Sequence, residues 1–417
     1  MNRLVDVPGY GRLWTASTVS IFGSYVTTLA LQFFLFDALG GDVEDLGLMN
    51  AARWLPYLLF GLVVGVLVDR YRRRPVLVAT DLGRAVLLCL LPVLYFLDRL
   101  TIPALVGFMF LFGALSLVFD AADQSLLPRV VPRPLLTAAN ARLQQSDAMA
   151  QSTGPLLAGA LLRLVGAPVA ILVDAASYLF SALMVASLRV EEPKPAPAER
   201  RHLLTELREG VSWVYRHRTL SAMALTTHVW FVFSSMLGTV LSAYMIEGLD
   251  FSPLKAGFVL AAGGLGGVLG GAVSGWAGRR FEVGPILAVT KALEPVAWLL
   301  VPLAMPDRSP VWMFAGAMFG FWFVLGVGGP FEMSYRASVT PDALQGRMAA
   351  TMRSFNRASI VLGAPLGGFL AGRFGYRTAL WVGIAGFAVV AVAVALSPLR
   401  GARHSDALDA EPAPAAD

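Results

Sequence analysis

The chain has 417 residues, of which 56% are hydrophobic and only 15% are charged, and its mean hydropathy is +0.65 with a formal net charge of +5. Soluble domains have about 45–50% apolar and about 25% charged residues, so this composition excludes an ordinary soluble protein and indicates a chain surrounded by lipid. The single cysteine, Cys89, excludes an intramolecular disulfide bond, and no Cys/His group has the spacing of a metal site.

Long apolar runs fill most of the sequence. A helix needs about 20 apolar residues to cross about 30 Å of hydrocarbon, and these runs are too long for strands and lack a two-residue alternation. We therefore predict an all-α integral membrane protein with twelve transmembrane helices. The predicted spans are 14–37, 45–69, 76–97, 103–127, 138–164, 168–188, 219–246, 254–278, 284–304, 311–335, 346–372 and 376–398.

The distribution of positive charge predicts the orientation. The first apolar run has full span length and no cleavage site follows a short apolar core, so we expect no removable signal peptide. A cytoplasmic N-terminus places most of the 33 Lys and Arg residues in cytoplasmic segments. Positive charge is retained on that side during insertion, which predicts that both termini are cytoplasmic.

The longest polar stretch divides six spans from six. It starts with three prolines and becomes a basic segment in which apolar residues recur at helical spacing, which predicts an amphipathic helix on the anionic inner leaflet. A solvated linker helix without lipid contact is the alternative. The predicted parts are an N-terminal six-helix bundle (1–190), this cytoplasmic linker (191–218), a C-terminal six-helix bundle (219–399) and a disordered cytoplasmic tail (400–417).

The two halves repeat weakly at an offset of 210 residues. The segment 75–80 (PVLVAT) corresponds to 285–290 (PILAVT), and Gly154-Pro155 corresponds to Ala364-Pro365. Such repeats in transporters are related by a pseudo-twofold axis along the membrane normal, with a substrate site between the halves near the midplane. We therefore expect alternating access, in which one half rocks against the other.

The segment 65–74 (GVLVDRYRRR), between the second and third spans, resembles the loop motif of the major facilitator superfamily. Arg72 stands where that motif often has glycine. Gly154 and Pro155 of the fifth span resemble the antiporter motif of drug exporters, although its closing Gly-Gly is missing at Leu157 and Ala158.

Other stretches resemble the branch of enterobactin exporters and macrolide-efflux proteins. They are 127–132 (LPRVVP), 139–141 (ANA) and 173–178 (VDAASY). This resemblance implies the major facilitator fold and an exporter in the bacterial plasma (inner) membrane. It also implies a gating role for the loop motif, because carboxylate–arginine pairs between helix ends can hold an inner gate closed. The alternative is that these arginines only set topology. The gate candidates are Gly65, Asp69, Arg70, Arg73 and Arg74.

Charged residues inside the spans are costly and are functional candidates. Asp81 and Arg84 in the third span are three residues apart, and Lys291 and Glu294 occupy the equivalent positions of the ninth span with reversed signs. Because each pair neutralises itself on one helix face, we interpret both mainly as structural.

Four intramembrane acids are the candidates for proton coupling. Asp120 and Asp123 share one face of the fourth span without a cation in their own turn, and like charges this close in a low dielectric favour proton uptake. Pairing with Arg129, Arg142 or Arg353 is the alternative. Asp147 and Asp174 also have no local partner. Either residue could carry the proton, and the alternative is that they form hydrogen bonds to Ser or Thr of other helices.

The resemblance implies a cavity lined by spans one, four, seven and ten. Their aromatic and polar residues suit a bulky, partly apolar ligand. His228 is either a proton switch or a hydrogen-bonded structural residue. The cavity candidates are Tyr25, Gln32, Phe119, His228, Trp230 and Trp322.

No nucleotide-binding loop of the form Gly-x-x-x-x-Gly-Lys-Ser/Thr occurs, so transport must be driven by an ion or substrate gradient. We expect a monomeric exporter of a small hydrophobic or amphiphilic compound (a drug, siderophore or metabolite) by proton antiport. We expect contact with membrane lipid, no cofactor, no metal and no nucleic acid. The alternatives are a lipid or lysophospholipid flippase of the same fold and a membrane-embedded transferase, for which the outer loops are too short.

Overall fold

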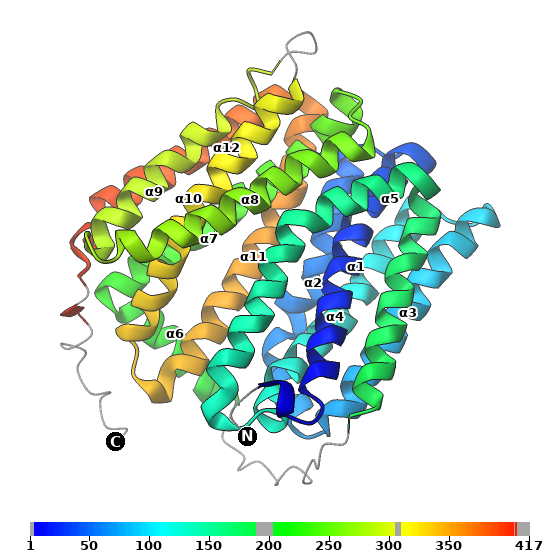
Figure 1. Ribbon diagram of the computed structural model, residues 1–417. Helices are drawn as coiled ribbons and strands as arrows, with labels where there is room; N and C mark the ends of the chain where they lie inside the picture. Colours follow the sequence, from blue (N-terminus) through cyan, green and yellow to red (C-terminus); the bar gives the residue numbers. More distant parts are fainter. Residues whose placement is uncertain (1–3, 189–202, 305–309, 404, 407–417) are drawn as a thin grey trace. The chain divides into compact units, whose positions relative to one another are not determined.

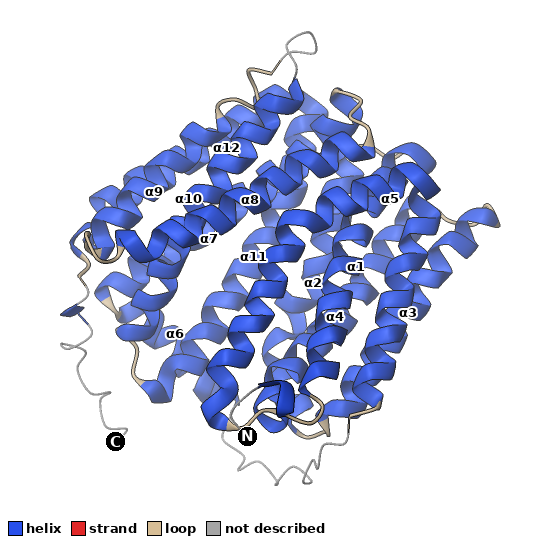
Figure 2. Cartoon of the chain, in the orientation of Figure 1, coloured by secondary structure: helices blue, strands red, loops and turns tan. Residues whose placement is uncertain are grey.

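The computed structural model describes residues 4–188, 203–304, 310–403 and 405–406, and these contain helices but no strand (Figures 1 and 2). The all-α prediction is confirmed. The α-helices are α1 (Tyr10–Phe33), α2 (Val43–Asp69), α3 (Arg73–Phe96), α4 (Ile102–Val130), α5 (Leu136–Ala186), α6 (Leu203–Arg216), α7 (Arg218–Ala243), α8 (Pro253–Ala277), α9 (Val283–Trp298), α10 (Pro310–Ser338), α11 (Asp342–Phe374) and α12 (Tyr376–Leu396). The short helices are η1 (Leu4–Asp6), η2 (Phe34–Ala38), η3 (Arg133–Leu135), η4 (Tyr244–Gly248) and η5 (Pro398–Gly401).

Each predicted span has a helical counterpart. The fifth and sixth spans are joined in α5, whose 51 residues are interrupted only at Gly166, with φ 78° and ψ 166°. Only glycine adopts this conformation readily, and the break falls in the predicted loop between those spans. In the described residues, eight helical segments are long and apolar enough to cross a membrane, and the one containing α5 has length for two crossings.

The chain divides into two compact units. Unit 1 comprises Met1–Glu199 with Leu241–Ala261, and unit 2 comprises Arg200–Val240 with Ala262–Asp417. The division follows the predicted halves except at 241–261. This segment joins unit 1 because α8 begins against α5, where Gly257 meets the Pro155 carbonyl and Gly159 meets the backbone of Pro253.

Within unit 1, α1 packs along α5, α2 packs against α4, and α3 contacts both α4 and α5. Buried apolar side chains such as Leu77, Leu88 and Leu126 fill the space between these helices. In unit 2, α9 packs against α10 and α12, and α6 packs against α11. Two helices carry the intramembrane charge pairs, α3 in unit 1 and α9 in unit 2. Each of them packs against two neighbouring helices of its own unit.

The internal repeat extends to the backbone. The π-helical turns η2 and η4 lie 210 residues apart, and Gly40 and Asp250, also 210 apart, both have positive φ (61° and 51°). The hydroxyls of Thr80 and Thr290 each donate to the carbonyl four residues earlier, at 2.9 and 2.8 Å. Equivalent positions of the two halves thus share local conformation as well as sequence.

The predicted linker helix is present as α6, but its buried face contacts protein. Glu209 forms an ion pair with Arg347 of α11, and Gly210 lies against Thr351 of the same helix. Val214 is only 1% exposed. The expected position on the inner leaflet therefore does not describe this face, which docks on α11.

The segment predicted as a disordered tail from residue 400 begins with ordered structure. The Gly284 amide donates to the carbonyl of Ala402 at 2.9 Å, and the Tyr335 hydroxyl donates to Asp406 at 2.8 Å. Leu399 and Ala402 are buried against unit 2. Residues 407–417 lie outside the described chain.

Helix packing in unit 1 depends on close backbone approach at Gly113 of α4, where a Cβ atom would overlap the Arg53 carbonyl of α2. We expect Gly113→Ala to lower the thermal stability of the purified protein, because overpacking against backbone costs about 1–3 kcal/mol. Thermal unfolding in detergent measures this. Gly107→Ala on the same helix meets nothing within 4 Å and serves as the control. Equal melting temperatures for both variants would contradict the close packing.

Candidate functional site

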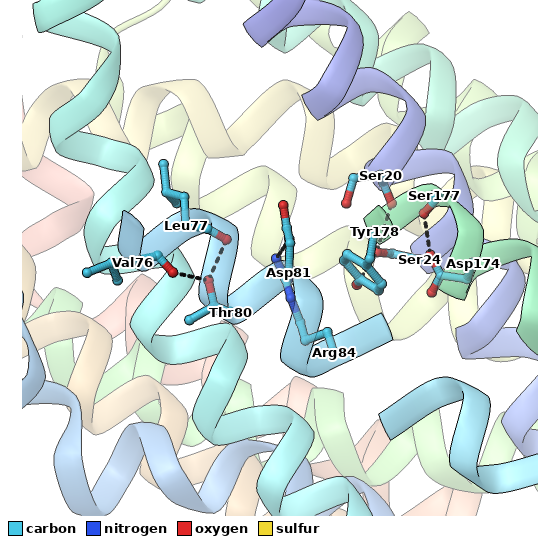
Figure 3. A network of polar contacts seen from close by, with 10 residues as sticks. All are labelled: Ser20, Ser24, Val76, Leu77, Thr80, Asp81, Arg84, Asp174, Ser177 and Tyr178. Atoms are coloured by element: carbon cyan, nitrogen blue, oxygen red, sulfur yellow. Dashed lines mark hydrogen bonds and ion pairs between the residues drawn. The ribbon is translucent and has the colours of Figure 1, made fainter. Parts of the chain in front are cut away.

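The ion pair predicted within the third span is buried at the centre of unit 1. Asp81 and Arg84 of α3 are 0% and 5% exposed and pair with each other (Figure 3). The Arg84 guanidinium lies between two aromatic rings, 4.1 Å from the centroid of Phe119 on α4 and 4.3 Å from that of Tyr178 on α5. Cation–π contacts of this kind stabilise a desolvated guanidinium, so Arg84 ties three helices together.

Polar side chains of α1 and α5 continue this arrangement. The hydroxyls of Tyr178 and Ser24 are 3.0 Å apart, and Ser177 donates to Asp174 at 2.8 Å (Figure 3). Gly23 of α1 faces these residues, and a Cβ atom there would overlap Asp174 and Ser177. The absence of a side chain at Gly23 thus makes room for a buried carboxylate.

Several buried polar atoms here have no hydrogen-bond partner in the described part of the chain. They include one carboxylate oxygen of Asp81, one of Asp174, and Nε of Arg84. The Thr27 hydroxyl faces Asp174 without a hydrogen bond of normal geometry. An unpaired buried polar atom costs about 1–3 kcal/mol and more when it is charged, so these atoms mark a site that gains from a proton or a rearrangement.

The acidic pair of α4 reaches the same place. The Tyr57 hydroxyl of α2 donates to Asp120 at 2.7 Å, and Asp123 interacts electrostatically with Asp120, Asp81 and Arg84. The nearby cation is therefore Arg84 of α3, which is not among the arginines considered from the sequence. We call Asp81, Arg84, Asp123 and Asp174, with the rings of Phe119 and Tyr178, the Arg84 cluster.

Asp147, the fourth proton-coupling candidate, has a different environment. It is exposed on the first half of α5 and interacts electrostatically with Tyr25 of α1. The structure thus brings Asp123 and Asp174 together around one arginine and leaves Asp147 at a surface of the unit.

The equivalent pair in unit 2 is arranged differently. Lys291 and Glu294 of α9 are 2.9 Å apart, and the Trp230 indole of α7 donates to the other Glu294 oxygen at 2.6 Å. The Lys291 ammonium lies 5.0 Å from the Trp230 ring centroid. That ring stacks on Phe321 and Phe387 at centroid distances of 6.4 and 5.9 Å. Both oxygens of this buried carboxylate are satisfied, in contrast to those of Asp81 and Asp174.

Two arginines of the predicted gate motif bind backbone oxygens. Arg74 donates to the carbonyls of Val185 and Ala186 at the end of α5, and the buried Arg73 donates to the Tyr71 carbonyl at 2.8 Å. Arg70 is exposed. The side chains of Gly65 and Asp69 lie outside what the structure describes, so their gating role stays a prediction.

The antiporter-like motif occupies close helix contacts. Gly154 packs on the ring of Tyr25, from which an added Cβ atom would be about 3.0 Å away, and the Pro155 carbonyl meets Gly257 of α8. The missing side chain at Gly154 and the carbonyl of the buried Pro155 therefore both serve helix packing within unit 1.

His228 is held by side chains of two other helices. Its Nδ1 lies 2.8 Å from Asn356 Oδ1 on α11, and its Nε2 lies 2.9 Å from the Tyr215 hydroxyl on α6. Because Asn356 Oδ1 can only accept, Nδ1 donates to it, and in the neutral imidazole Nε2 then accepts from the Tyr215 hydroxyl. These bonds suit a neutral imidazole that joins three helices, which favours the structural interpretation of His228.

The other cavity candidates are distributed over both units. Phe119 and Trp230 belong to the two charge clusters, and Trp322 of α10 packs on Gly263 of α8. The buried Gln32 Oε1 on α1 has no hydrogen-bond partner in the described residues. Whether these side chains bind substrate stays a prediction.

Two charged residues of these sites were missed from the sequence. Arg53 of α2 lies 5.9 Å from the Phe112 ring centroid, and its charge acts on Asp174. Glu332 of α10 accepts from Thr227 at 3.0 Å and lies 3.9 Å from Arg336. Each of these two acidic or basic residues interrupts an apolar run, and this feature of the sequence could have identified both of them.

Comparison with known proteins decides the family. A profile of the Major Facilitator Superfamily matches residues 13–293 and 223–416. The chain belongs to the major facilitator superfamily. It is therefore a multi-pass membrane transporter rather than an enzyme, and the transferase alternative is set aside.

Among the relatives of this superfamily transporter, macrolide efflux protein A of Streptococcus pyogenes is 20% identical over 399 residues, 94% of this chain and 96% of that protein. The multidrug efflux pump Tap of Mycolicibacterium fortuitum is 27% identical over 394 residues, 91% of this chain and 93% of the relative. An inward-facing bacterial homologue of the iron transporter ferroportin has a TM-score of 0.76 at 16% identity, covering 94% of this chain and 99% of that one. The last likeness confirms the predicted fold.

The charge balance at Arg84 generates a stability prediction. We expect Arg84→Gln to destabilise the transporter by about 3–5 kcal/mol, because it leaves buried carboxylates without their cation. The double variant Asp81→Asn/Arg84→Gln should be less destabilised than the single variant. A double-mutant cycle from thermal unfolding in detergent measures the coupling, and Lys291→Gln with Glu294→Gln is the matched cycle in unit 2. If the losses of stability in the two single variants of Asp81 and Arg84 simply added up in the double variant, the pairing of these residues would be contradicted.

Proposed function

We propose that this transporter exports hydrophobic or amphiphilic small compounds and exchanges them for protons. Its relatives are named as macrolide and multidrug efflux proteins, which supports export of such compounds. The observation that carries the coupling is the excess of acid in the Arg84 cluster, where three carboxylates surround one guanidinium within a membrane-spanning unit.

The excess of acid supports coupling for an electrostatic reason. A low-dielectric interior does not tolerate several uncompensated carboxylates, so at least one takes up a proton or finds a new partner. Asp174 is fully buried with one unpartnered oxygen, and Asp123 is half-buried beside Asp120. A proton entering from outside would settle on this group, and its release inside would restore the attraction to Arg84. Alternating protonation would thus bias helix positions around α3.

The direction of this cycle depends on topology. We propose cytoplasmic N- and C-termini in a bacterial plasma membrane, because the basic residues of the loops then face the cytoplasm. In this orientation the Arg70–Arg74 segment is at the inner surface, where the proposed gate would act. The cavity candidates Tyr25, Gln32, Phe119, His228, Trp230 and Trp322 would contact a ligand recognised mainly by shape and stacking.

Transport into inside-out vesicles tests proton coupling. We expect an imposed pH gradient to drive uptake of at least one compound from a panel of fluorescent dyes, macrolides and lysophospholipids. Asp174→Asn and Asp123→Asn should each reduce the gradient-driven component at least tenfold and preserve downhill equilibration, because the proton-binding carboxyl is lost while the substrate path remains. Asp98→Asn, in the loop between α3 and α4, is the control.

Gradient-independent uptake of every compound by the unmodified protein would refute coupling. Full gradient stimulation in both the Asp123 and the Asp174 variants would exclude these two carboxylates as proton carriers and leave Asp120 and Asp147 among the four candidates. Transport of lysophospholipid alone among the panel would favour the flippase alternative.

Topology is testable because the sequence contains a single cysteine. In a Cys89→Ser background, we expect Arg99→Cys to react with a membrane-impermeant maleimide added to intact cells, since this exposed loop follows α3 on the proposed outer side. Ser405→Cys, at the exposed C-terminal segment, should react only after the membrane is opened. The reverse labelling pattern would overturn the proposed orientation.

A further inference from the structure

A cavity of about 430 Å³ lies at the beginning of α3 in unit 1. Its lining includes the side chains of Arg72 and Arg74, the first turns of α3, and Ala186 at the end of α5. The two arginines are at one end of the cavity, and apolar residues of α3 form the rest. The cavity is therefore amphipathic, with a cationic end where α3 starts.

The cationic end is suited to an anion for two separate reasons. Arg74 is held in place by the Val185 and Ala186 carbonyls, so its charge is fixed at the cavity, while Arg72 is exposed. The first turn of α3 contains no acidic residue, and the Arg72 side chain at its N-cap makes no capping hydrogen bond. Amides at a helix N-terminus and guanidinium groups both favour phosphate oxygens.

The apolar end continues along α3 as an exposed stripe. Leu82, which lines the cavity, is 43% exposed, and Val86, Leu90 and Val93 follow it at 65%, 41% and 50%. Their spacing of three or four residues places them on one helix face. This stripe runs from the cationic end toward the opposite end of α3, which is the course of an acyl chain below a lipid headgroup.

The internal repeat shows what fills the equivalent place in unit 2. There, at an offset of 210 residues, Glu282 and Gly284 stand in place of the two arginines. The Gly284 amide donates to the Ala402 carbonyl, and a Cβ atom at Gly284 would overlap the backbone of Leu399 and Arg400. The start of α9 is therefore covered by the chain itself. The start of α3 instead has a cavity and two additional positive charges.

We propose that this cavity binds an anionic phospholipid of the cytoplasmic leaflet, with its phosphate at Arg72 and Arg74 and an acyl chain along Leu82 and Val86. The leaflet follows from the proposed orientation, whereas the lipid chemistry follows from the cavity alone. A soluble phosphate would use the cationic end but leave the apolar stripe uncovered. None of the residues that line this cavity belongs to the Arg84 cluster.

Lipid competition on the purified full-length protein tests the site. Native mass spectrometry from mixed micelles compares retention of phosphatidylglycerol with that of phosphatidylcholine of the same acyl chains. We expect selective retention of phosphatidylglycerol, lowered about fivefold in Arg72→Gln because one basic residue near the membrane surface is lost. Arg72→Lys should keep most of the selectivity. Arg279→Gln, in the corresponding loop before α9, makes the same change of charge and should retain the lipid as the unmodified protein does.

Equal retention of the two lipids by the unmodified protein would overturn the proposal, as would an equal loss in the Arg72→Gln and Arg279→Gln proteins. Displacement of the lipid by millimolar inorganic phosphate would identify a soluble anion as the occupant. Arg72→Lys keeps the test decisive if Arg72→Gln does not fold.

Discussion

An ionised group in a membrane-spanning helix must find its counter-charge inside the protein, because the surrounding hydrocarbon offers none. In unit 1 this constraint converges on Arg84, which pairs with Asp81 on its own helix and lies between rings contributed by α4 and α5. The guanidinium thus neutralises the Asp81 carboxylate and connects α3 with α4 and α5. The helix packing around α3 depends on this cation, and its charge also acts on Asp123 and, together with that of Arg53, on Asp174.

The two units meet the constraint in opposite ways. The Glu294 carboxylate uses one oxygen for Lys291 and the other for the Trp230 indole, which leaves a neutral and fully bonded pair. Asp81 and Asp174 each keep an oxygen without a partner in the described residues, and Asp123 adds further negative charge. The equivalent charge pairs of the two halves therefore differ, since the Glu294 carboxylate is fully hydrogen-bonded and the Asp81 carboxylate is not. This asymmetry is the structural difference on which the proposed proton coupling rests.

Sequence reasoning succeeded where the information is local. Apolar runs predicted the spans to within a few residues, the loop between spans five and six fell at Gly166, and the three-residue spacing predicted the Asp81–Arg84 pair. Features that depend on tertiary packing were missed. The sandwich of Arg84 between rings and the burial of α6 against α11 join residues far apart in the chain. Spacing along one helix contains no information about such partners.

The position of a residue in the sequence did not always decide its role. For His228 the sequence left both a proton switch and a structural residue open, and the contacts of its two nitrogens with Asn356 and Tyr215 favour the structural role. Arg53 and Glu332 were overlooked although each is a charge in an apolar run. Glu332 has Arg336 one turn later, whereas Asp174, on which the charge of Arg53 acts, belongs to another helix. A departure from a motif was informative in the same way. Arg72, where the loop motif often has glycine, lines the cavity at the start of α3.

The junction inside α5 has a mechanical consequence. A single residue, Gly166, separates the stretch that contains Pro155 and Gly159 from the stretch that contains Asp174. Because the connection is a single residue, a displacement of one arm at this end also moves the start of the other arm. Any sliding of α8 over Pro155 and Gly159 would be passed through the bend to the carboxylate facing Gly23. The fifth and sixth spans would then act as a lever between a helix-packing seam and a buried charge.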